Sequence, residues 1–334
     1  MNDVSIAVLG AGAWGTALAI LLARAGRRVT LCVRRPEHLK AIRSARENAA
    51  YLPGVEIAHD INLSSDWTAS VAQAGVVVMT VPSRHARGAI VPIAAGIRRD
   101  ALLVSATKGL EPGTLLTMTA MLREAVPGIS GTAVLSGPGF AAEVARGKPA
   151  ALVAASSDEA VARRARDLFA GRSIRVYSSI DVVGVEIAGA AKNVIAIAAG
   201  ASDGLDLGAS ARAAVITRGL AEMMRLAAAA GGRRETIAGL SGLGDLVLTC
   251  TGDLSRNRAA GLALGRGNPP ATDDTTAGRP IAEGISNAQT VRELAHRIGA
   301  EMPIVEAVYR ALYEAQPAHT MVEELLSREL KAEF

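Results

Sequence analysis

The segment VSIAVLGAGAWGTALA, residues 4–19, decides the fold of this chain. An apolar run at residues 4–10 leads directly into the pattern GAGAWG, which opens a helical segment. A GxGxxG pattern between a strand and a helix is typical of a dinucleotide-binding unit. In such a turn Gly10 permits the sharp bend, Gly12 lets the backbone approach a pyrophosphate, and Gly15 lets the helix pack on the strand. We therefore expect phosphates at the N-terminus of this helix, although a tight turn without a ligand would show the same letters.

The first half of the chain alternates short apolar runs with helical segments. Near-continuous apolar strands separated by helices predict a parallel sheet that is buried on both faces. The alternation itself predicts a doubly wound, Rossmann-like fold. The expected strands are residues 4–10, 28–33, 76–81, 101–107, 132–137 and 151–156, and the expected helices are residues 15–25, 36–47, 84–96, 113–125 and 158–170.

After residue 180 the pattern changes to long, Ala-rich helical segments. We expect helices at residues 183–201, 209–230, 255–265, 287–299, 304–313 and 321–331, with a loop at 265–278 by composition. A length of 334 residues also favours two domains. The fold class is therefore α/β: an N-terminal Rossmann-like doubly wound parallel sheet over residues 1–180, followed by an all-helical C-terminal domain over residues 181–334.

Composition excludes several classes of partner. Aromatic residues make up 3% of the chain and no run of five like charges occurs, so nucleic-acid binding is not expected. Two distant cysteines in apolar contexts, Cys32 and Cys250, fit a reducing compartment. None of the five histidines lies at metal-ligand spacing, so no metal is expected. Because the N-terminus lacks the features of a signal peptide, we expect a cytoplasmic protein.

The end of the second expected strand bears on the choice of cofactor. NAD-specific sites place an acidic residue about 20 residues after the glycine turn, where it binds the ribose hydroxyls. Here Arg34 and Arg35 occupy that place. Because arginine suits a 2′-phosphate, the pattern favours NADP(H), with NAD(H) as the alternative cofactor. Two solvated surface arginines would also account for it.

The carboxyl ends of the other strands are polar or rich in glycine, and ligands of open α/β sheets bind at these ends. They read VPS (81–83), TKG (107–109) and SGPGF (136–140). Lys108 follows an apolar strand, so it either extends to solvent or points at a ligand. The SGPG turn offers backbone N–H groups to an anion or a nicotinamide, or it is an ordinary turn.

The helical half contains a lysine in an apolar stretch. Residues 182–201 could span a membrane by length, but Glu186, Lys192 and Asn193 lie inside the stretch, and a central charge costs roughly 2.5–3.5 kcal/mol. We therefore expect a buried helix and no membrane span. Lys192 is either part of a structural ion pair or a proton donor whose pKa is lowered by burial. Asp245, among glycines and apolar residues, is its candidate partner, whereas Glu186 falls on another face of the helix.

A second polar segment, LSRNRAAG at residues 254–261, reads as a helix start with Ser255 as the N-cap. It places Arg256, Asn257 and Arg258 in the first turn, where cations oppose the helix dipole by roughly 0.3–1 kcal/mol. Arginine at a helix N-terminus is a good phosphate site. The pattern therefore predicts a phosphate anchor, with a charged helix start as the alternative.

These motifs together resemble the bacterial type of NAD(P)-dependent glycerol-3-phosphate dehydrogenase. The resemblance covers nearly the whole chain. It rests on GAGAWGTALA (10–19), YLPG (51–54), VPS (81–83), TKGLE (107–111), SGPGFAAEVARGKP (136–149), EIAGAAKNVIAIAAG (186–200), GLGDLVLTCT (242–251), SRN (255–257), AEG (282–284) and EMPI…VY (301–309).

The resemblance implies an enzyme that interconverts dihydroxyacetone phosphate and sn-glycerol 3-phosphate for glycerophospholipid synthesis. It implies Lys192 as the catalytic proton donor and acceptor, with Asp245 beside it and Lys108 at both cofactor and substrate. It implies a homodimer. The implied substrate contacts are Lys108, Gly137, Gly139, Lys192, Asp245, Ser255, Arg256 and Asn257. The implied cofactor contacts are Gly10, Gly12, Ala13, Trp14, Gly15, Arg34, Arg35, Tyr51, Lys108, Ala141, Arg256, Ile281 and Glu283.

Two positions depart from the family. The family usually has Ser or Thr where this chain has Gly139, so that hydroxyl is absent here. It often has Thr near the place of Asn287, to which no role is assigned. Two other functions stay open: a β-hydroxyacid dehydrogenase acting on a small carboxylate, and a nicotinamide-binding sensor without catalysis.

Overall fold

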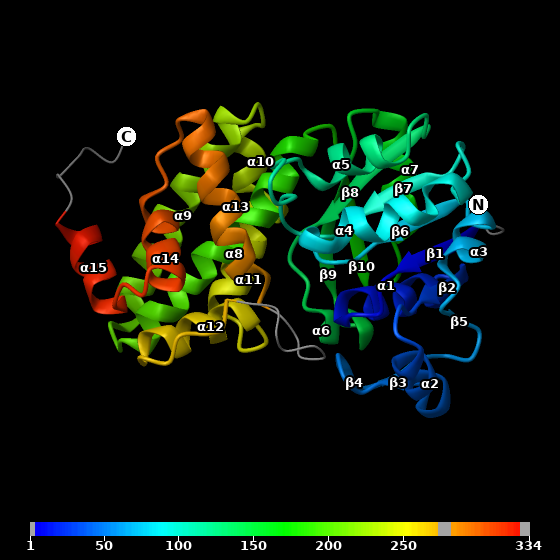
Figure 1. The fold of residues 1–334 in the computed structure, drawn as a ribbon, viewed down its shortest axis with the longest axis horizontal. Coiled ribbons are helices and arrows are strands. Elements are labelled where there is room, and N and C mark those ends of the chain that lie inside the picture. The colour runs from blue at the N-terminus through cyan, green and yellow to red at the C-terminus, as the bar shows by residue number, and fades with distance from the viewer. Residues whose placement is uncertain (1–3, 273–281, 328–334) are drawn as a thin grey trace.

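The computed structural model describes residues 4–272 and 282–327, and it divides into a sheet-based half and a helical half (Figure 1). The first half contains β1 (Ser5–Leu9), α1 (Ala13–Arg24), β2 (Arg28–Cys32), α2 (Pro36–Ala45), β3 (Glu47–Asn48), β4 (Leu52–Glu56), β5 (Asn62–Ser64), α3 (Trp67–Ala72), β6 (Val76–Met79), α4 (Ser83–Ile90), the 3₁₀ helix η1 (Val91–Gly96), β7 (Leu102–Ser105), α5 (Met118–Ala125), β8 (Gly131–Ser136), α6 (Ala141–Ala145), β9 (Ala150–Ala155), α7 (Glu159–Phe169) and β10 (Ile174–Ser179).

Among its described residues, the second half contains helices joined by loops and no strand. It contains α8 (Val182–Gly204), α9 (Gly208–Ala229), α10 (Arg234–Ala238), the π-helical turn η2 (Leu240–Gly244), α11 (Asp245–Thr251), α12 (Arg256–Gly265), α13 (Glu283–Ile298), α14 (Pro303–Tyr313) and α15 (Ala318–Leu326).

The main sheet has the strand order β10-β9-β8-β7-β6-β1-β2-β5, with β1 bonded to both β2 and β6. Side chains of β1 alternate between its faces, because Ile6 and Val8 enter one apolar core and Ala7 and Leu9 the other. Helices α1 and α7 cover the first face, and α4 and α5 cover the second. The expected doubly wound α/β fold is therefore confirmed.

The expectation of a wholly parallel sheet is wrong at one edge. Strands β5, β2, β1, β6, β7 and β8 are parallel, whereas β9 pairs antiparallel with β8 and β10 follows β9 in parallel. A parallel neighbour needs a connection that crosses the sheet, usually through a long helix. Helix α6 has only five residues and packs on α1, so the chain turns back and β9 runs the other way.

Several expected boundaries also change. The helix expected from residue 113 begins at Met118, the helix expected at 84–96 ends as 3₁₀ turns, and the helix expected at 287–299 begins at Glu283. The helix expected at 321–331 begins at Ala318, and residues 328–331 lie outside the described part, as do residues 273–278 of the expected loop. The division at 180/181 stays a prediction; β10 ends at Ser179, and Asp181 caps α8 through the backbone N–H of Gly184.

Helix α8 is the core of the helical half. It is long and apolar enough to cross a membrane, but 89% of its most apolar window is buried inside the protein. Glycines let α12 lie directly against it: a Cβ on Gly200 would lie 2.1 Å from the Arg258 carbonyl oxygen, and a Cβ on Gly261 would lie 2.0 Å from that of Ile197. Because only glycine fits at this crossing, α12 lies directly against the C-terminal part of α8.

Candidate active site

The glycine turn after β1 has the close backbone geometry that its sequence predicts. Gly10 has φ +109°, a conformation that side chains disfavour, and a Cβ on Gly15 would lie 2.0 Å from the Gly10 carbonyl oxygen. The buried amide of Asn48 donates to the Ala11 carbonyl oxygen at 2.9 Å and to the Thr16 hydroxyl at 2.8 Å. A Cβ on Gly12 would meet nothing within 4 Å. The turn is thus rigid, and the backbone of Gly12 is open to a ligand.

The two arginines after β2 differ in their surroundings. Arg34 is exposed, whereas Arg35 is half-buried and its guanidinium donates to the Tyr51 hydroxyl at 3.0 Å. Tyr51 lies in the short β3–β4 hairpin and its ring contacts that of His38. The hairpin therefore holds the Tyr51 hydroxyl beside the Arg35 guanidinium.

Two buried charges and one half-buried charge meet where the two halves of the chain join. The Asp245 carboxylate accepts from Lys108 Nζ at 2.6 Å and from Lys192 Nζ at 3.1 Å. Lys108 comes from the loop after β7, Lys192 from the middle of α8, and Asp245 from the first turn of α11. Lys192 and Asp245 are 4% and 2% exposed, so water screens their interaction little. Asp245 is thus the expected partner of Lys192, and it pairs with Lys108 as well.

Thr249 completes the surroundings of Lys192. Its hydroxyl accepts from Lys192 Nζ at 2.7 Å and donates to the main-chain carbonyl oxygen of Asp245 at 2.6 Å. An ammonium group has three N–H donors. Because Asp245 and Thr249 take two of them, one donor of Lys192 is left for a ligand.

The protonation equilibria of this cluster are strongly perturbed. Burial lowers the pKa of Lys192 from 10.5 to about 8, against the attraction of Asp245 and with the repulsion of Lys108. Burial disfavours the charged form of Asp245, but the two ammonium groups outweigh it and hold the pKa of that carboxyl below its ordinary value. Lys192 can therefore gain and lose a proton near neutral pH, while Asp245 stays ionised.

The start of α12 faces the same cavity. The Ser255 hydroxyl caps the helix by accepting from the Arg258 backbone N–H at 3.1 Å, as expected. Asn257 donates to the Asn193 side-chain oxygen at 2.7 Å and accepts from the Gly284 backbone N–H at 2.9 Å. Arg256 is exposed.

Arg258, the second of the two arginines in this turn, does not face the cavity. Arg258 turns away from the cavity and pairs with Asp203 on α8 at 2.8 Å. It also pairs with Asp253 at 3.1 Å. Arg258 therefore fastens α12 to α8, and Arg256 is the arginine of this turn that reaches the cavity.

A cavity of about 420 Å³ joins these elements. The predicted site residues that line it are Ala13, Trp14, Tyr51, Lys108, Gly139, Ala141, Lys192, Asp245, Ser255, Arg256, Asn257 and Glu283. Those outside its lining are Gly10, Gly12, Gly15, Arg34, Arg35 and Gly137. Ile281 lies outside the described residues.

Sequence reasoning missed several lining residues, namely Leu52, Pro53, Ala106, Phe140, Ala142, Arg146, Thr249 and Leu254. One of them carried a usable signal. Thr249 stands four residues after Asp245, a spacing that places both on one face of a helix. The others lie in short elements such as β4 and α6 or in loops, where the sequence pattern does not indicate which side chains face a cavity.

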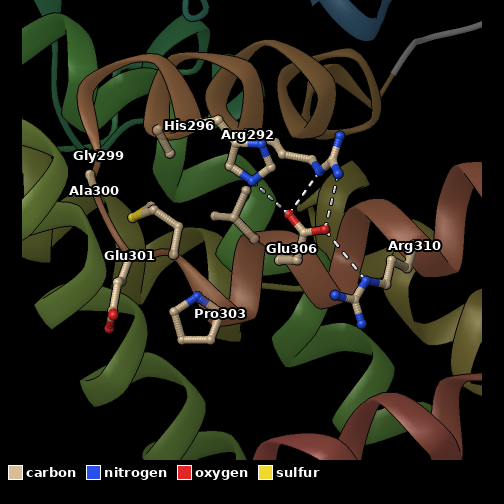
Figure 2. Close-up of a pocket in the computed structure, with 11 residues that line it drawn as sticks. Arg292, His296, Gly299, Ala300, Glu301, Pro303, Glu306 and Arg310 are labelled. Atoms are coloured by element: carbon tan, nitrogen blue, oxygen red, sulfur yellow. Dashed lines mark hydrogen bonds and ion pairs between the residues drawn. The ribbon is translucent and has the colours of Figure 1, made fainter.

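A second hollow of about 590 Å³ lies between α13 and α14 (Figure 2). Figure 2 shows Arg292, His296 and Arg310 turned toward one carboxylate, that of Glu306. The closest contact is Arg292 Nε to Glu306 Oε2, at 2.7 Å. The charges of this hollow satisfy one another, and no element of the dinucleotide turn reaches it. Among residues 4–272 and 282–327, no group of three His, Cys, Asp or Glu side chains could hold a metal ion.

Fold and site together define a class of protein. A rigid glycine turn on a doubly wound sheet, facing a buried lysine with a lowered pKa on a helical domain, is the arrangement of a two-domain nicotinamide-dinucleotide dehydrogenase. The chain matches two protein-family models. One, "NAD-dependent glycerol-3-phosphate dehydrogenase N-terminus", covers residues 5–162, and the model of the C-terminus of the same family covers residues 181–323. The chain belongs to the NAD-dependent glycerol-3-phosphate dehydrogenase family.

Individual relatives agree along the whole chain. The glycerol-3-phosphate dehydrogenase [NAD(P)+] of Geobacter sulfurreducens is 49% identical over 330 residues, 98% of each chain. That of a Bradyrhizobium strain is 50% identical over 329 residues, again 98% of each. The crystal structure of glycerol-3-phosphate dehydrogenase from Coxiella burnetii superposes with a TM-score of 0.92 at 39% identity, and the match covers 98% of this chain and 100% of that one.

Proposed function

We propose that this chain catalyses the reversible reduction of dihydroxyacetone phosphate to sn-glycerol 3-phosphate with NADPH or NADH. The observation that carries the proposal is the single cavity in which Lys192, Asp245 and Lys108 lie between residues of the dinucleotide turn and the start of α12. The test is oxidation of NADPH or NADH with dihydroxyacetone phosphate as the only substrate. Turnover of a small β-hydroxyacid instead would contradict the proposal, and cofactor binding without any turnover would indicate a sensor.

The glycine turn fits a dinucleotide, because Gly12 leaves open space where any other residue would place a Cβ. The cofactor, when bound, supplies the hydride. Gly10, Gly12, Ala13, Trp14 and Gly15 hold its phosphates from the turn and the first residues of α1. Arg34, Arg35, Tyr51, Ala141 and Glu283 would hold the rest of it, and Lys108 and Arg256 would reach it from the substrate side. Ile281, which the family resemblance adds, lies outside the described residues.

Lys192 is the residue that moves the proton. Its third N–H donates to the substrate carbonyl oxygen, and that oxygen takes the proton as it gains negative charge. Asp245 and Thr249 orient the ammonium group, and Asp245 offsets part of the cost of burying it. A pKa of about 8 suits both directions, since each protonation state of Lys192 is populated near neutral pH.

The substrate phosphate binds at the start of α12, to Ser255, Arg256 and Asn257, while Gly137 and Gly139 contact the substrate from the turn after β8. Gly139 has room for a side chain, because a Cβ there would lie 3.4 Å from Val144 and 3.6 Å from Trp14. The missing hydroxyl at this position therefore leaves space in the cavity. We further propose a cytoplasmic homodimer that supplies glycerophospholipid synthesis.

Arg256 gives a prediction for substrate affinity. Arg256→Ala removes a charge-assisted hydrogen bond to phosphate, which is worth about 1.5–3 kcal/mol. We expect the KM for dihydroxyacetone phosphate to rise about 10- to 100-fold, and inhibition by inorganic phosphate to weaken in parallel. Arg266→Ala, at the other end of the same helix, is the matched control. An unchanged KM in Arg256→Ala would remove this residue from the phosphate site.

Arg34 gives a prediction for cofactor choice. Arg34→Ala should raise the KM for NADPH about tenfold and leave that for NADH nearly unchanged, because NADPH alone carries the 2′-phosphate. Steady-state kinetics with both cofactors measures the ratio. Arg43→Ala is the control, since Arg43 lies on α2 but donates to the Leu63 carbonyl oxygen. A ratio that stays at the wild-type value would show that Arg34 is a solvated surface residue.

A further inference from the structure

Asn287 is a buried polar residue that has no role in the proposed reaction. It lies on α13 and is 1% exposed. Its amide donates to the main-chain carbonyl oxygen of Ala190 at 3.2 Å. Ala190 stands two residues before Lys192 on α8, so Asn287 holds the backbone that carries the proton donor.

The other end of the Asn287 side chain meets the loop that carries Lys108. A Cβ on Gly109 would lie 2.7 Å from Asn287 Oδ1 and 2.7 Å from Ser83 Oγ, and Gly109 has φ +143°. The loop backbone thus fits between α13 and the first residue of α4 with no room for a side chain. Gly109 follows Lys108 directly, so the position of this glycine determines where the stem of Lys108 begins.

The same loop is anchored in the helical half at a second point. Leu110 is fully buried in the apolar core of the helices, although it belongs to a loop of the sheet half. The Glu111 carboxylate accepts hydrogen bonds from Nε and Nη2 of Arg87, at 2.7 and 2.8 Å. These contacts fix the outer part of the loop, whereas Asn287 contacts it beside Lys108 itself.

We propose that Asn287 is a positioning residue that sets the distance between Lys108 and Lys192 on either side of Asp245. The two lysines come from different halves of the chain, and Asn287 contacts the backbone next to one and near the other. When the amide is absent, the loop after β7 is free to shift relative to α8. Lys108 then moves away from Asp245, and Lys192 takes a larger share of that carboxylate.

The inference rests on the proposed function for its kinetic test. Asn287→Ala should lower kcat with dihydroxyacetone phosphate about 10- to 100-fold, since misplacement by about 1 Å has effects of this size. The affinity for NADPH should change far less than kcat, since Lys108 is only one of the proposed cofactor contacts. Asn287→Thr, which keeps a hydroxyl donor on α13, should recover most of the lost kcat.

Thr290→Val is the matched control. Thr290 lies one turn further along α13, is buried, and its hydroxyl donates only to the Asn287 main-chain oxygen among the contacts that the structure describes, at 3.4 Å. The substitution removes a buried hydrogen bond from the same helix without touching Gly109 or Ala190. It should lower stability while leaving kcat unchanged.

A second readout does not depend on turnover. The groups that act on Lys192 are Asp245, Lys108 and Glu283, and Lys108 lowers its pKa by repulsion. In Asn287→Ala the midpoint for acylation of Lys192, read by peptide mass over a pH series, should therefore move to higher pH, while Thr290→Val keeps the wild-type midpoint. If wild type turns over no dihydroxyacetone phosphate, the proposed function fails and this midpoint alone decides the inference. Equal midpoints and equal kcat in the two variants would overturn it.

Discussion

Lys192→Met should abolish most turnover while the protein still binds NADPH. Methionine keeps the volume of the lysine stem but has no acidic proton to transfer. The carbonyl oxygen of the substrate therefore has no proton donor as the hydride arrives. General acid catalysis contributes about 10²- to 10⁴-fold, and we expect kcat to fall by at least that factor. Stopped-flow oxidation of NADPH and fluorescence titration of the cofactor measure the two quantities separately. Lys148→Met, at an exposed lysine paired with Glu143, is the control.

The same variant should be more stable than wild type at pH 7. Burial lowers the pKa of Lys192 from 10.5 to about 8, so between these values the unfolded chain holds a proton that the folded protein has released. The contribution of Lys192 to the free energy of unfolding therefore rises with pH between about 8 and 10.5 and is lowest below pH 8. At about 1.4 kcal/mol per pH unit, the gain in Lys192→Met approaches about 3 kcal/mol, less the lost hydrogen bond to Thr249.

Denaturant unfolding at pH 7 and above pH 10.5 tests the sign. The gain of the variant over wild type should be largest at pH 7 and should be lost at high pH, where folded and unfolded lysine are both neutral and only the missing hydrogen bond to Thr249 remains. The pH dependence of turnover is a further check: reduction should fall as pH rises through about 8, and oxidation of glycerol 3-phosphate should rise. Near-normal turnover in Lys192→Met would refute the assignment of the proton donor.

The parts of the site that lie close together in the sequence could be predicted from it. The glycine turn is one continuous motif in which each glycine has its own steric reason, and the structure places Gly10 and Gly15 in the expected close contacts. The Ser255 cap is equally local, since the hydroxyl and the N–H that it accepts are three residues apart. Such features depend on neighbouring residues and little on the rest of the fold.

Contacts between distant segments could not be predicted in the same way. Lys108 and Asp245 are 137 positions apart, and nothing in either segment indicates that they meet. Residues 151–156 read correctly as a strand, but periodicity carries no direction, so the antiparallel pairing of β9 was missed. The helix-start pattern did not indicate which of Arg256 and Arg258 faces a ligand, because Asp203, the partner of Arg258, lies on another helix. In each case the partner depends on how elements distant in the sequence pack together, which a local pattern does not specify.

Asp245→Asn should produce the largest loss of stability of any single change in this cavity. The carboxylate is the shared counter-charge of two ammonium groups, at 2.6 and 3.1 Å, and it is 2% exposed. Removing one partner of a buried ion pair costs about 3–5 kcal/mol, because the remaining charge is left without compensation. Here two charges of the same sign remain and repel each other. We expect a loss of at least that size at pH 7, measured by urea unfolding.

The loss should shrink as pH rises, because a neutral Lys192 no longer needs the carboxylate. Turnover should fall as well, since without Asp245 the pKa of Lys192 drops below its wild-type value and a smaller fraction of the enzyme holds the proton at pH 7. Asp253→Asn is the control: Asp253 is 98% exposed in its pair with Arg258, and exposed pairs contribute about 0–1 kcal/mol. If Asp245→Asn were as stable as wild type, the two lysines would not depend on Asp245 as their shared counter-charge.

A double variant separates repulsion from a simple packing defect. Adding Lys108→Met to Asp245→Asn removes one of the two facing ammonium groups. If charge repulsion causes the instability, the double variant should recover a substantial part of the lost unfolding free energy, a coupling of about 0.5–3 kcal/mol between contacting residues. If the asparagine merely packs badly, the second substitution should add a further loss instead. Turnover should recover in neither case, because the carboxylate that orients Lys192 is still missing.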